Sequence, residues 1–347
     1  MRLALAALLL APLTLSPLAH AQDVNVLVSH GVKTGTEGKT QFPTIQMALD
    51  HHPFPTVGPD GKLGRVFIRI EPGVYHERII VTQNHKNITL IGLGKSPSDV
   101  VITNSLNAKQ AGGTFFTETA EINGTGFEAD NITFENTAGN TGQAVAVADR
   151  SDRSVFKNCR FIGHQDTLFA DYGRQFYIDS YIEGGVDFIF GNATAVFDHD
   201  EIHSNGPGYL TAQSRTSPDQ TTGYVILDSK VTSGVAQALA ANPDLAKHHR
   251  DSISLGRPWR PYARVVYIHT ELPADIIPQG FSAWGRTPGT PLAYYAEYDD
   301  YGPGANPSAR APWTHQLTKA QAAQYMPKVF LAGKDGWNPV AAAAKLP

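Results

Sequence analysis

The stretch VFKNCRFIGHQDTLFADYGRQFYIDSYIEG (residues 155–184) begins and ends with two similar nine-residue segments, VFKNCRFIG and FYIDSYIEG. Each segment starts with an apolar pair, continues through polar residues and closes on an apolar residue followed by small or polar ones. Two further segments, VFDHDEIHS (196–204) and VILDSKVTS (225–233), show the same pattern and align with the first two without gaps. One aligned column, at steps of 21, 20 and 29 residues, reads Phe161, Ile182, Ile202 and Val231. A repeat of about twenty residues therefore organises the middle of the chain.

Short β-branched and aromatic segments at this spacing, separated by Gly, Asn and Asp, are typical of a parallel β-helix, in which each coil buries its apolar face against the next. Fainter copies occur in KNITLIG (86–92), DNITFEN (130–136) and RVVYIHT (264–270). We predict an all-β fold, a parallel β-helix solenoid. A β-sandwich is the alternative, but its hairpins favour Asn-Gly or Asp-Gly turns. Four such dipeptides occur, Asp60-Gly61, Asn123-Gly124, Asn205-Gly206 and Asp335-Gly336, and none lies within the aligned segments of the repeat.

Helical patterns occur only near the two ends of the chain. PTIQMALDHHP (43–53) offers Thr44 as an N-cap, and LTKAQAAQYM (317–326) places Thr318 and Gln321 at capping-box spacing. We expect these short helices to cover the open ends of the stack. No linker divides the chain, so residues 22–347 are predicted to form one domain.

The first 21 residues have the pattern of a secretory signal peptide. They contain one arginine, an apolar run over residues 3–15 and the small-x-small site Ala19-His20-Ala21. The run is shorter than the roughly 20 residues of a membrane span and contains a proline. We therefore expect a mature chain, residues 22–347, that is secreted to the periplasm or the cell exterior and is not held in a membrane.

The charge balance and the cysteine and histidine content narrow the class of function. The chain has 28 Lys+Arg against 32 Asp+Glu, a formal net charge of −4, which disfavours nucleic acid as a partner. Cys159 is the single cysteine, so an internal disulfide is excluded. The pairs His51-His52 and His248-His249 lie in polar, turn-like contexts, and we predict no metal site from them.

Two aspartates occupy the same position in consecutive repeats. Asp166 lies five residues after Phe161, and Asp187 lies five residues after Ile182. Because adjacent strands are about 4.8 Å apart, the two carboxylates are expected to be neighbours. Mutual repulsion would make one hold its proton while the other ionises first, as in an acid and nucleophile pair. The alternative is that each aspartate merely caps a turn.

Two glutamines and one arginine complete the candidate site. Gln143 lies 23 residues before Asp166, one coil earlier, and Gln165 directly precedes Asp166. Their amides could hold an oxyanion without adding charge. Arg257, in the segment LGRPW, is the candidate cation that keeps one carboxylate ionised. Solvent-facing glutamine ladders and an arginine that only packs or pairs are the structural alternatives.

The coil that follows is expected to leave the site open. Pro207 stands one coil after Asp187 and is followed by Gly208, two residues with little side chain to fill the space. The sequence therefore predicts a groove on the outside of the stack that fits an extended chain. An acidic polymer in that groove would have to be bound by a few placed cations.

With these residues in place, the sequence resembles the pectin methylesterases (pectinesterases). The likeness spans roughly residues 25–335. Seven segments match in the family's order, a far more specific signal than any one of them. They are GVYHE (73–77), GFEADNITFENTAG (126–139), GQAVA (142–146), QDTL (165–168), VDFIFGNATAVF (186–197), TAQSRTSPDQTTG (211–223) and LGRPW (255–259).

The resemblance implies a right-handed parallel β-helix that removes methyl groups from esterified galacturonan without a metal or organic cofactor. By the same resemblance, Asp187 is the nucleophile and Asp166 the general acid and then base. Gln143 and Gln165 stabilise the oxyanion, and Arg257 is the partner of Asp187. The positions implied to contact sugar rings are Thr114, Phe115, Phe169, Phe190, Trp259 and Trp284.

The departures from plant members, together with the Ala-rich signal segment, favour a bacterial form. We also expect the secreted protein to be a monomer. Plant-type cysteine pairs and an inhibitory pro-domain are missing, and His164 stands where plant members carry Tyr. Three other functions stay open at this point. They are a glycoside hydrolase, whose carboxylates are also about 5 Å apart, a periplasmic thioesterase, and a non-catalytic carbohydrate-binding protein on the same fold.

Overall fold

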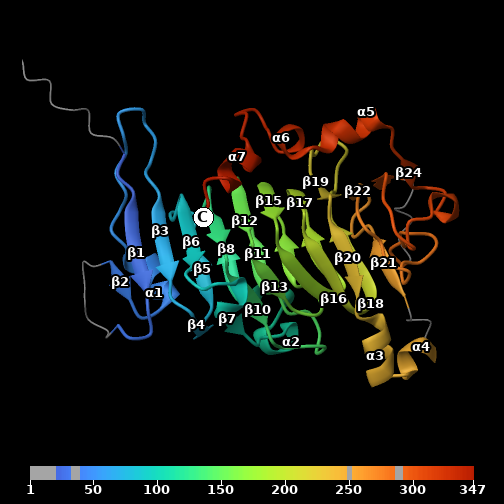
Figure 1. The fold of residues 1–347 in the computed structure, drawn as a ribbon, viewed down its shortest axis with the longest axis horizontal. Coiled ribbons are helices and arrows are strands. Elements are labelled where there is room, and N and C mark those ends of the chain that lie inside the picture. The colour runs from blue at the N-terminus through green and yellow to red at the C-terminus, as the bar shows by residue number, and fades with distance from the viewer. Residues whose placement is uncertain (1–20, 33–39, 248–251, 286–291) are drawn as a thin grey trace, which may run out of the picture.

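The computed structural model describes residues 21–32, 40–247, 252–285 and 292–347. There the chain winds into a stack of coils, and strands from successive coils lie side by side along the long axis (Figure 1). Every pairing between two named strands is parallel. This excludes the β-sandwich and confirms the predicted right-handed parallel β-helix.

The first face of the helix is a continuous sheet that follows the whole stack. Its strands, in spatial order, are β2 (Gln41–Phe42), β1 (Val24–Val28), β3 (Val66–Ile70), β6 (Ile88–Gly92), β9 (Glu128–Asp130), β12 (Ser154–Lys157), β15 (Arg174–Ile178), β17 (Thr194–Asp198), β19 (Gly223–Leu227), β22 (Arg264–Ile268), β23 (Tyr294–Tyr298) and β24 (His315–Gln316). The four aligned segments of the repeat begin on this face.

Two further faces are joined by two long bent strands, β16 (Tyr181–Gly191) and β18 (Glu201–Gln213). The start of β16 pairs with the second face and its end pairs with the third. The second face contains β4 (Gly73–His76), β7 (Val100–Asn104), β10 (Thr133–Asn136), β13 (Arg160–Ile162) and β20 (Lys230–Ser233). The third contains β5 (Ile79–Val81), β8 (Ala120–Ile122), β11 (Val147–Asp149), β14 (Leu168–Ala170) and β21 (Ile253–Gly256).

The predicted column of the repeat is in register on the second face. Phe161 pairs with Ile182, Ile182 with Ile202, and Ile202 with Val231. On the first face the neighbouring aromatic column points inward. Phe156, Tyr177 and Phe197 stack with ring centroids 5.0 and 4.7 Å apart and planes within 10° of parallel. Such aromatic pairs contribute about 0.5–1.5 kcal/mol each beyond the area they bury, so the repeat sets both register and core.

Helices cover part of the stack. The α-helices are α1 (Ile45–His51), α2 (Ala108–Ala111), α3 (Val235–Ala241), α4 (Asp244–Lys247), α5 (Lys319–Ala322), α6 (Pro327–Phe330) and α7 (Pro339–Ala343). The 3-10 helices are η1 (Pro97–Asp99), η2 (Thr114–Phe116), η3 (Pro307–Ala309) and η4 (Ala323–Tyr325). The helices α2, α3 and α4 lie mid-chain and were not predicted. None of the described helices is long and apolar enough to cross a membrane.

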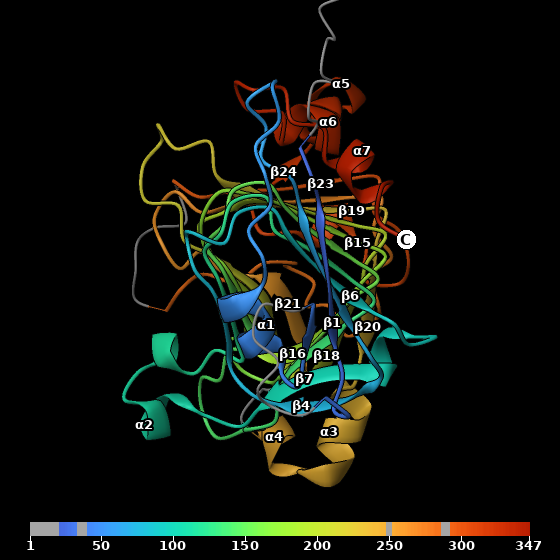
Figure 2. The same cartoon turned by 90° about the vertical axis from the view of Figure 1, so that its left-hand side faces the viewer.

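The N-terminal helix lies where the sequence predicts it. The side chain of Thr44 accepts a hydrogen bond from the Met47 backbone amide at 3.2 Å, and Ile45, Ala48 and Leu49 are buried. Figure 2 shows α1 across the N-terminal end of the stack. The signal-peptide prediction concerns residues 1–21, of which 1–20 lie outside the described residues.

The C-terminal helices differ from the prediction. Thr318 and Gln321 do form the expected capping box, but α5, α6 and α7 run along the stack instead of closing its open end (Figure 1). They cover an apolar column on the outer side of the first face, which contains Val155, Phe176, Val196, Val225, Val266 and Ala296. Because this column would otherwise expose its apolar surface to water, its burial determines where the helices lie.

Candidate active site

The two aspartates singled out in the sequence lie one coil apart on the third face. Asp166 precedes β14 and Asp187 lies within β16, and the backbone amide of Asp166 donates to the carbonyl of Val186 at 3.1 Å. Both have left-handed backbone conformations, with φ of 63° and 51°, which Asp tolerates better than most residues. The equal spacing from the repeat column therefore did bring the two carboxyl groups into neighbouring coils.

Arg257 follows β21 and binds the carboxylate of Asp187 with two hydrogen bonds. Its Nε donates to Oδ1 at 2.8 Å and its Nη2 donates to Oδ2 at 2.6 Å. The guanidinium carbon is also 3.8 Å from the ring centroid of Tyr209 and 4.1 Å from that of Trp284. Aromatic faces attract the guanidinium, so Tyr209 and Trp284 help to hold Arg257 against Asp187.

The two aspartates have different electrostatic environments. Burial raises the pKa of Asp166 well above its ordinary value, and the neighbouring charge of Asp187 raises it further. Burial also raises the pKa of Asp187, but the hydrogen bonds and charge of Arg257 oppose this. At neutral pH the arrangement therefore favours an ionised Asp187 beside a protonated Asp166, as the acid and nucleophile hypothesis requires.

The candidate residues surround one cavity of about 290 Å³ on the outside of the stack. The lining residues are Thr114, Phe115, Gln143, Gln165, Asp166, Asp187, Phe190, Ala212, Arg257, Trp259 and Trp284. Ten of the eleven candidate site residues are in this set. The exception is Phe169, and Ala212, at the end of β18, is the lining residue that sequence analysis missed.

Phe169 supports the cavity wall from behind. It is 5% exposed, with ring centroids of Phe115 and Phe190 at 4.9 and 4.6 Å. Phe190 is in turn 6.1 Å from Trp259, so the four rings form a continuous row. Phe169 therefore lies behind the residues that line the cavity, and its contact with a sugar stays a prediction.

The two glutamines lie in register with each other. Gln143 forms a parallel bridge with Gln165, and Gln165 forms one with Val186. Gln143 therefore lies one coil before Gln165, and the two side chains are neighbours in the stack. Within the described residues neither side-chain amide has a protein hydrogen-bond partner. Both amides are free to donate to a bound group.

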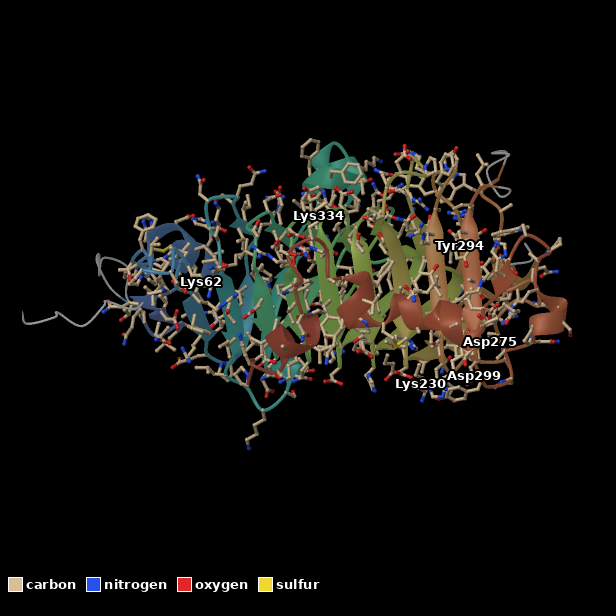
Figure 3. The ribbon with its side chains drawn as sticks, turned by 90° about the horizontal axis from the view of Figure 1, so that it is seen from above. Lys62, Lys230, Asp275, Tyr294, Asp299 and Lys334 are labelled. Carbon is tan, nitrogen blue, oxygen red and sulfur yellow. The ribbon has the colours of Figure 1, made fainter. Side chains whose placement is uncertain are left out.

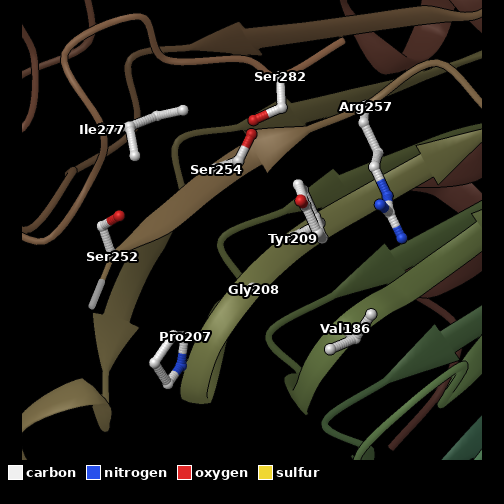
Figure 4. Close-up of a pocket in the computed structure, with 9 residues that line it drawn as sticks. All are labelled: Val186, Pro207, Gly208, Tyr209, Ser252, Ser254, Arg257, Ile277 and Ser282. Atoms are coloured by element: carbon white, nitrogen blue, oxygen red, sulfur yellow. The ribbon is translucent and has the colours of Figure 1, made fainter. Parts of the chain in front are cut away.

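The expectation of open space beside Asp187 at Pro207 and Gly208 is wrong in register. β18 carries extra residues between the two stretches that pair with β16, so Val186 pairs with Tyr209. Pro207 and Gly208 instead line a second cavity of about 310 Å³, together with Tyr209 and Arg257 (Figure 4). The two cavities share Arg257, and Tyr209 is the functional residue that sequence reasoning missed.

Among the described residues that line this cavity, the two aspartates are the only His, Cys, Asp or Glu side chains. In the part of the chain that the structure describes, Asp198, His199 and Asp228 form the only group of three or more such side chains with ligand atoms close enough for a metal. None of the three lines either cavity. The pair His248-His249, from which the sequence predicts no metal site, lies outside the described residues.

The fold and the site define the class of protein: a β-helical hydrolase with a carboxylate pair in an aromatic groove. The pectinesterase family model matches residues 31–334, and the chain belongs to the pectinesterase family. It is similar to Pectinesterase 31 of Arabidopsis thaliana, 36% identical, with 86% of this chain and 92% of that protein covered. The carrot (Daucus carota) pectinesterase is also 36% identical, with 88% and 94% covered.

Other relatives are longer than this chain. Pectinesterase 1 of Citrus sinensis is 37% identical, but the chain spans only 51% of its length. Among solved structures, the pectin methylesterase from carrot has a TM-score of 0.77 at 34% identity, with 90% of this chain and 94% of that chain covered. The pectin methylesterase PemA from Erwinia chrysanthemi has a TM-score of 0.70 at 28% identity, with 93% and 99% covered. The plant origin of these sequence relatives leaves the bacterial assignment a prediction.

Proposed function

We propose that the protein hydrolyses the methyl esters of galacturonan in pectin and releases methanol, with Asp187 as nucleophile. The observation that carries the proposal is the unequal environment of the two carboxylates. Arg257 binds Asp187 with two hydrogen bonds, whereas Asp166 is buried beside the charge of Asp187. Membership of the pectinesterase family supplies the reaction class.

In the first step, a carboxylate oxygen of Asp187 attacks the ester carbonyl carbon. The carbonyl oxygen becomes an oxyanion, which accepts hydrogen bonds from the free amides of Gln143 and Gln165. The tetrahedral intermediate collapses with cleavage of the bond to the methoxy oxygen, and the Asp166 carboxyl gives its proton to that oxygen. Methanol leaves, and the galacturonate acyl group remains on Asp187 as an anhydride.

In the second step, water takes the place of methanol. Asp166, now ionised, removes a proton from the water, whose oxygen attacks the galacturonate carbonyl of the anhydride. Cleavage of the anhydride releases the free galacturonic acid group and restores the Asp187 carboxylate, which is again hydrogen-bonded to Arg257. Asp166 is again protonated, so the enzyme returns to its starting state without a cofactor.

The polysaccharide is proposed to lie along the row of aromatic side chains. Phe115 is 45% exposed, and Phe190, Trp259 and Trp284 form the cavity wall beside the carboxylates. Apolar ring faces pack well against the flat faces of sugars, while Thr114 offers a hydroxyl. One structural relative, 27% identical with a TM-score of 0.68, is a pectin methylesterase in complex with a hexasaccharide.

One assay separates the proposal from its rivals. Incubation with methyl-esterified pectin should release methanol at an unchanged number of reducing ends. New reducing ends without methanol would indicate a glycoside hydrolase instead, and binding without either product would indicate a carbohydrate-binding protein. Hydrolysis of a thioester substrate with no action on pectin would favour the thioesterase.

The site of action and the assembly state are part of the same proposal. A cleaved signal peptide would give a chain that begins at Gln22 and acts outside the cytoplasm as a monomer. N-terminal sequencing of the exported protein and light scattering after size-exclusion chromatography test these two statements. An N-terminus other than residue 22, or a mass of twice the mature chain, would contradict them separately.

A further inference from the structure

The turns that follow the strands of the first face hold one left-handed residue in each of seven consecutive coils. We name these residues the turn ladder; their φ angles lie between 45° and 58°. In each step the backbone amide of the ladder residue donates to the end of the strand in the next coil, as from His199 to Leu227 and from Asp228 to Ile268. The members are Asn131, Asn158, Asp179, His199, Asp228, His269 and Asp299.

The chemistry of the turn ladder changes along the stack. The first two members are amides, and the Asn158 side chain donates to that of Asn131 at 3.0 Å. The last five members alternate between carboxylate and imidazole. Asn, Asp and His all tolerate this backbone conformation. Carboxylates and imidazoles, which can bind metal ions, therefore replace the amides without added backbone strain. Figure 3 shows Asp299, at the end of the ladder, on the edge opposite Tyr294.

Three side chains of this region already converge. One ligand atom each from Asp198, His199 and Asp228 lies within 4.8 Å of the other two. Even an equilateral triangle of that size has its centre only about 2.8 Å from each atom, close to the roughly 2.0–2.2 Å of zinc to nitrogen and oxygen. The His199 side chain is 60% exposed and its Nδ1 lies 2.7 Å from Oδ1 of Asp198, so the imidazole has to rotate away from this contact to bind an ion together with that carboxylate.

The two carboxylates of the cluster have no lysine or arginine partner within the described residues. Asp198 is buried, and the basic partners of Asp198 and Asp228 within the described residues are histidines alone. In successive coils, the carboxylate of Asp198 contacts His199 and the carboxylate of Asp228 contacts His269. A bound divalent ion would neutralise the two carboxylates and connect two successive coils.

We propose that Asp198, His199 and Asp228 bind a divalent transition-metal ion of the zinc type. His269 lies one coil further, with its Nδ1 2.8 Å from Oδ1 of Asp228, and orients that carboxylate as a second-layer partner. Two carboxylates and one imidazole match zinc and leave a position for water. The site is separate from the cavity of Asp166 and Asp187, so it acts on the stability of the stack.

The test is calorimetric titration of the untagged mature chain with zinc chloride at pH 7.5. The wild type should bind one ion with a dissociation constant on the order of micromolar. His199→Asn and Asp228→Asn should each weaken the affinity at least tenfold, and Asn131 and Asn158 show that Asn fits the ladder. Asp299→Asn is the matched control, with the same backbone conformation two coils away, and should bind zinc within twofold of the wild type.

A second measurement separates binding at this site from binding elsewhere. Saturating zinc should raise the melting temperature of the wild type and of Asp299→Asn, but not that of His199→Asn. Absence of a saturable site below about 1 mM zinc would overturn the proposal. Wild-type affinity in both His199→Asn and Asp228→Asn would also overturn it, because zinc would then bind at other histidines. Neither outcome depends on pectin hydrolysis.

Discussion

The guanidinium of Arg257 holds both carboxylate oxygens of Asp187, with Nε on Oδ1 at 2.8 Å and Nη2 on Oδ2 at 2.6 Å. Asp166, one coil earlier, receives no such pair of hydrogen bonds within the described residues. Arg257 reaches Asp187 from β21, seventy positions further along the chain. The two stacked aspartates therefore differ in electrostatic environment because an arginine from another coil binds only one of them.

Asp187→Asn should abolish methanol release. The amide keeps the size of the side chain but is not a nucleophile, so we expect a loss of at least about 10⁴-fold in kcat. The measurement is methanol release from methyl-esterified pectin, with circular dichroism as the test of folding. Asp179→Asn is the matched control, since Asp179 has a similar φ of 52° and lies outside the cavity. Substantial activity in Asp187→Asn would remove Asp187 from the nucleophile role.

Gln143→Ala and Gln165→Ala should each lower kcat by about 10² to 10³-fold, the usual cost of one oxyanion donor. KM should change little, because the oxyanion exists only after attack. Steady-state kinetics on methyl-esterified pectin measures both constants, and Gln83→Ala, an exposed glutamine away from the cavity, is the control. A rise in KM with kcat intact would show instead that the amides bind the ground-state substrate.

The sequence predicts the strand register correctly in those coils that follow the repeat. Asp166 and Asp187 could be paired because each follows its column residue by the same count, and coils of nearly constant length preserve that count in three dimensions. Gln143 pairs with Gln165, which lies 22 positions further along, whereas Asp166 and Asp187 are 21 positions apart, so the coil length varies by one residue here. The register of the strands is thus predictable wherever the loops between them are equal.

Where the loops between strands differ in length, the register predicted from the sequence is wrong. The extra residues in β18 place Tyr209 opposite Val186, and the spacing of the repeat contains no signal for them. The C-terminal helices were misplaced because Val155 and Val225, on the outer side, look like core residues until the helices cover them. His199 and Asp228 occupy the same position of the aligned segments, but the repeat contains no signal that Asp198 lies beside them.

Tyr209→Leu should weaken the hold of Arg257 on Asp187. Loss of the aromatic face, 3.8 Å from the guanidinium carbon, removes about 0.5–2 kcal/mol of cation–π attraction, or roughly 2- to 30-fold in kcat/KM. Since Arg257 lowers the pKa of Asp187, a looser Arg257 should move the acidic limb of the pH–rate profile to higher pH.

Tyr209→Phe is the matched control for this prediction. It keeps the ring and removes only the hydroxyl, so both the rate and the acidic limb should stay near those of the wild type. An equal effect of both substitutions would show that the hydroxyl group, and not the ring stacked on Arg257, is what matters at this position.

Buried Asp149 should make the stability of the fold depend on pH. It lies in β11 and is 0% exposed, and its Oδ1 accepts a hydrogen bond from the Ser151 amide at 2.9 Å. Its Oδ2 has no hydrogen-bond partner in the part of the chain that the structure describes. Burial raises the pKa of Asp149 to about 8, against about 3.9 for an unfolded chain. Between these two values the folded state keeps a proton that the unfolded state has released.

The free energy of unfolding should therefore fall as pH rises from about 4 to about 8, by up to about 1.4 kcal/mol per pH unit from this one group. Asp149→Asn keeps the acceptor for Ser151 but cannot ionise, so its stability should decline less steeply over this interval. Urea denaturation at several pH values measures the slopes, with the exposed Asp60→Asn as control. Burial also raises the pKa values of Asp200 and Asp300, so the stability of Asp149→Asn should still fall somewhat as pH rises. Equal slopes of unfolding free energy against pH for Asp149→Asn and the wild type would contradict the prediction.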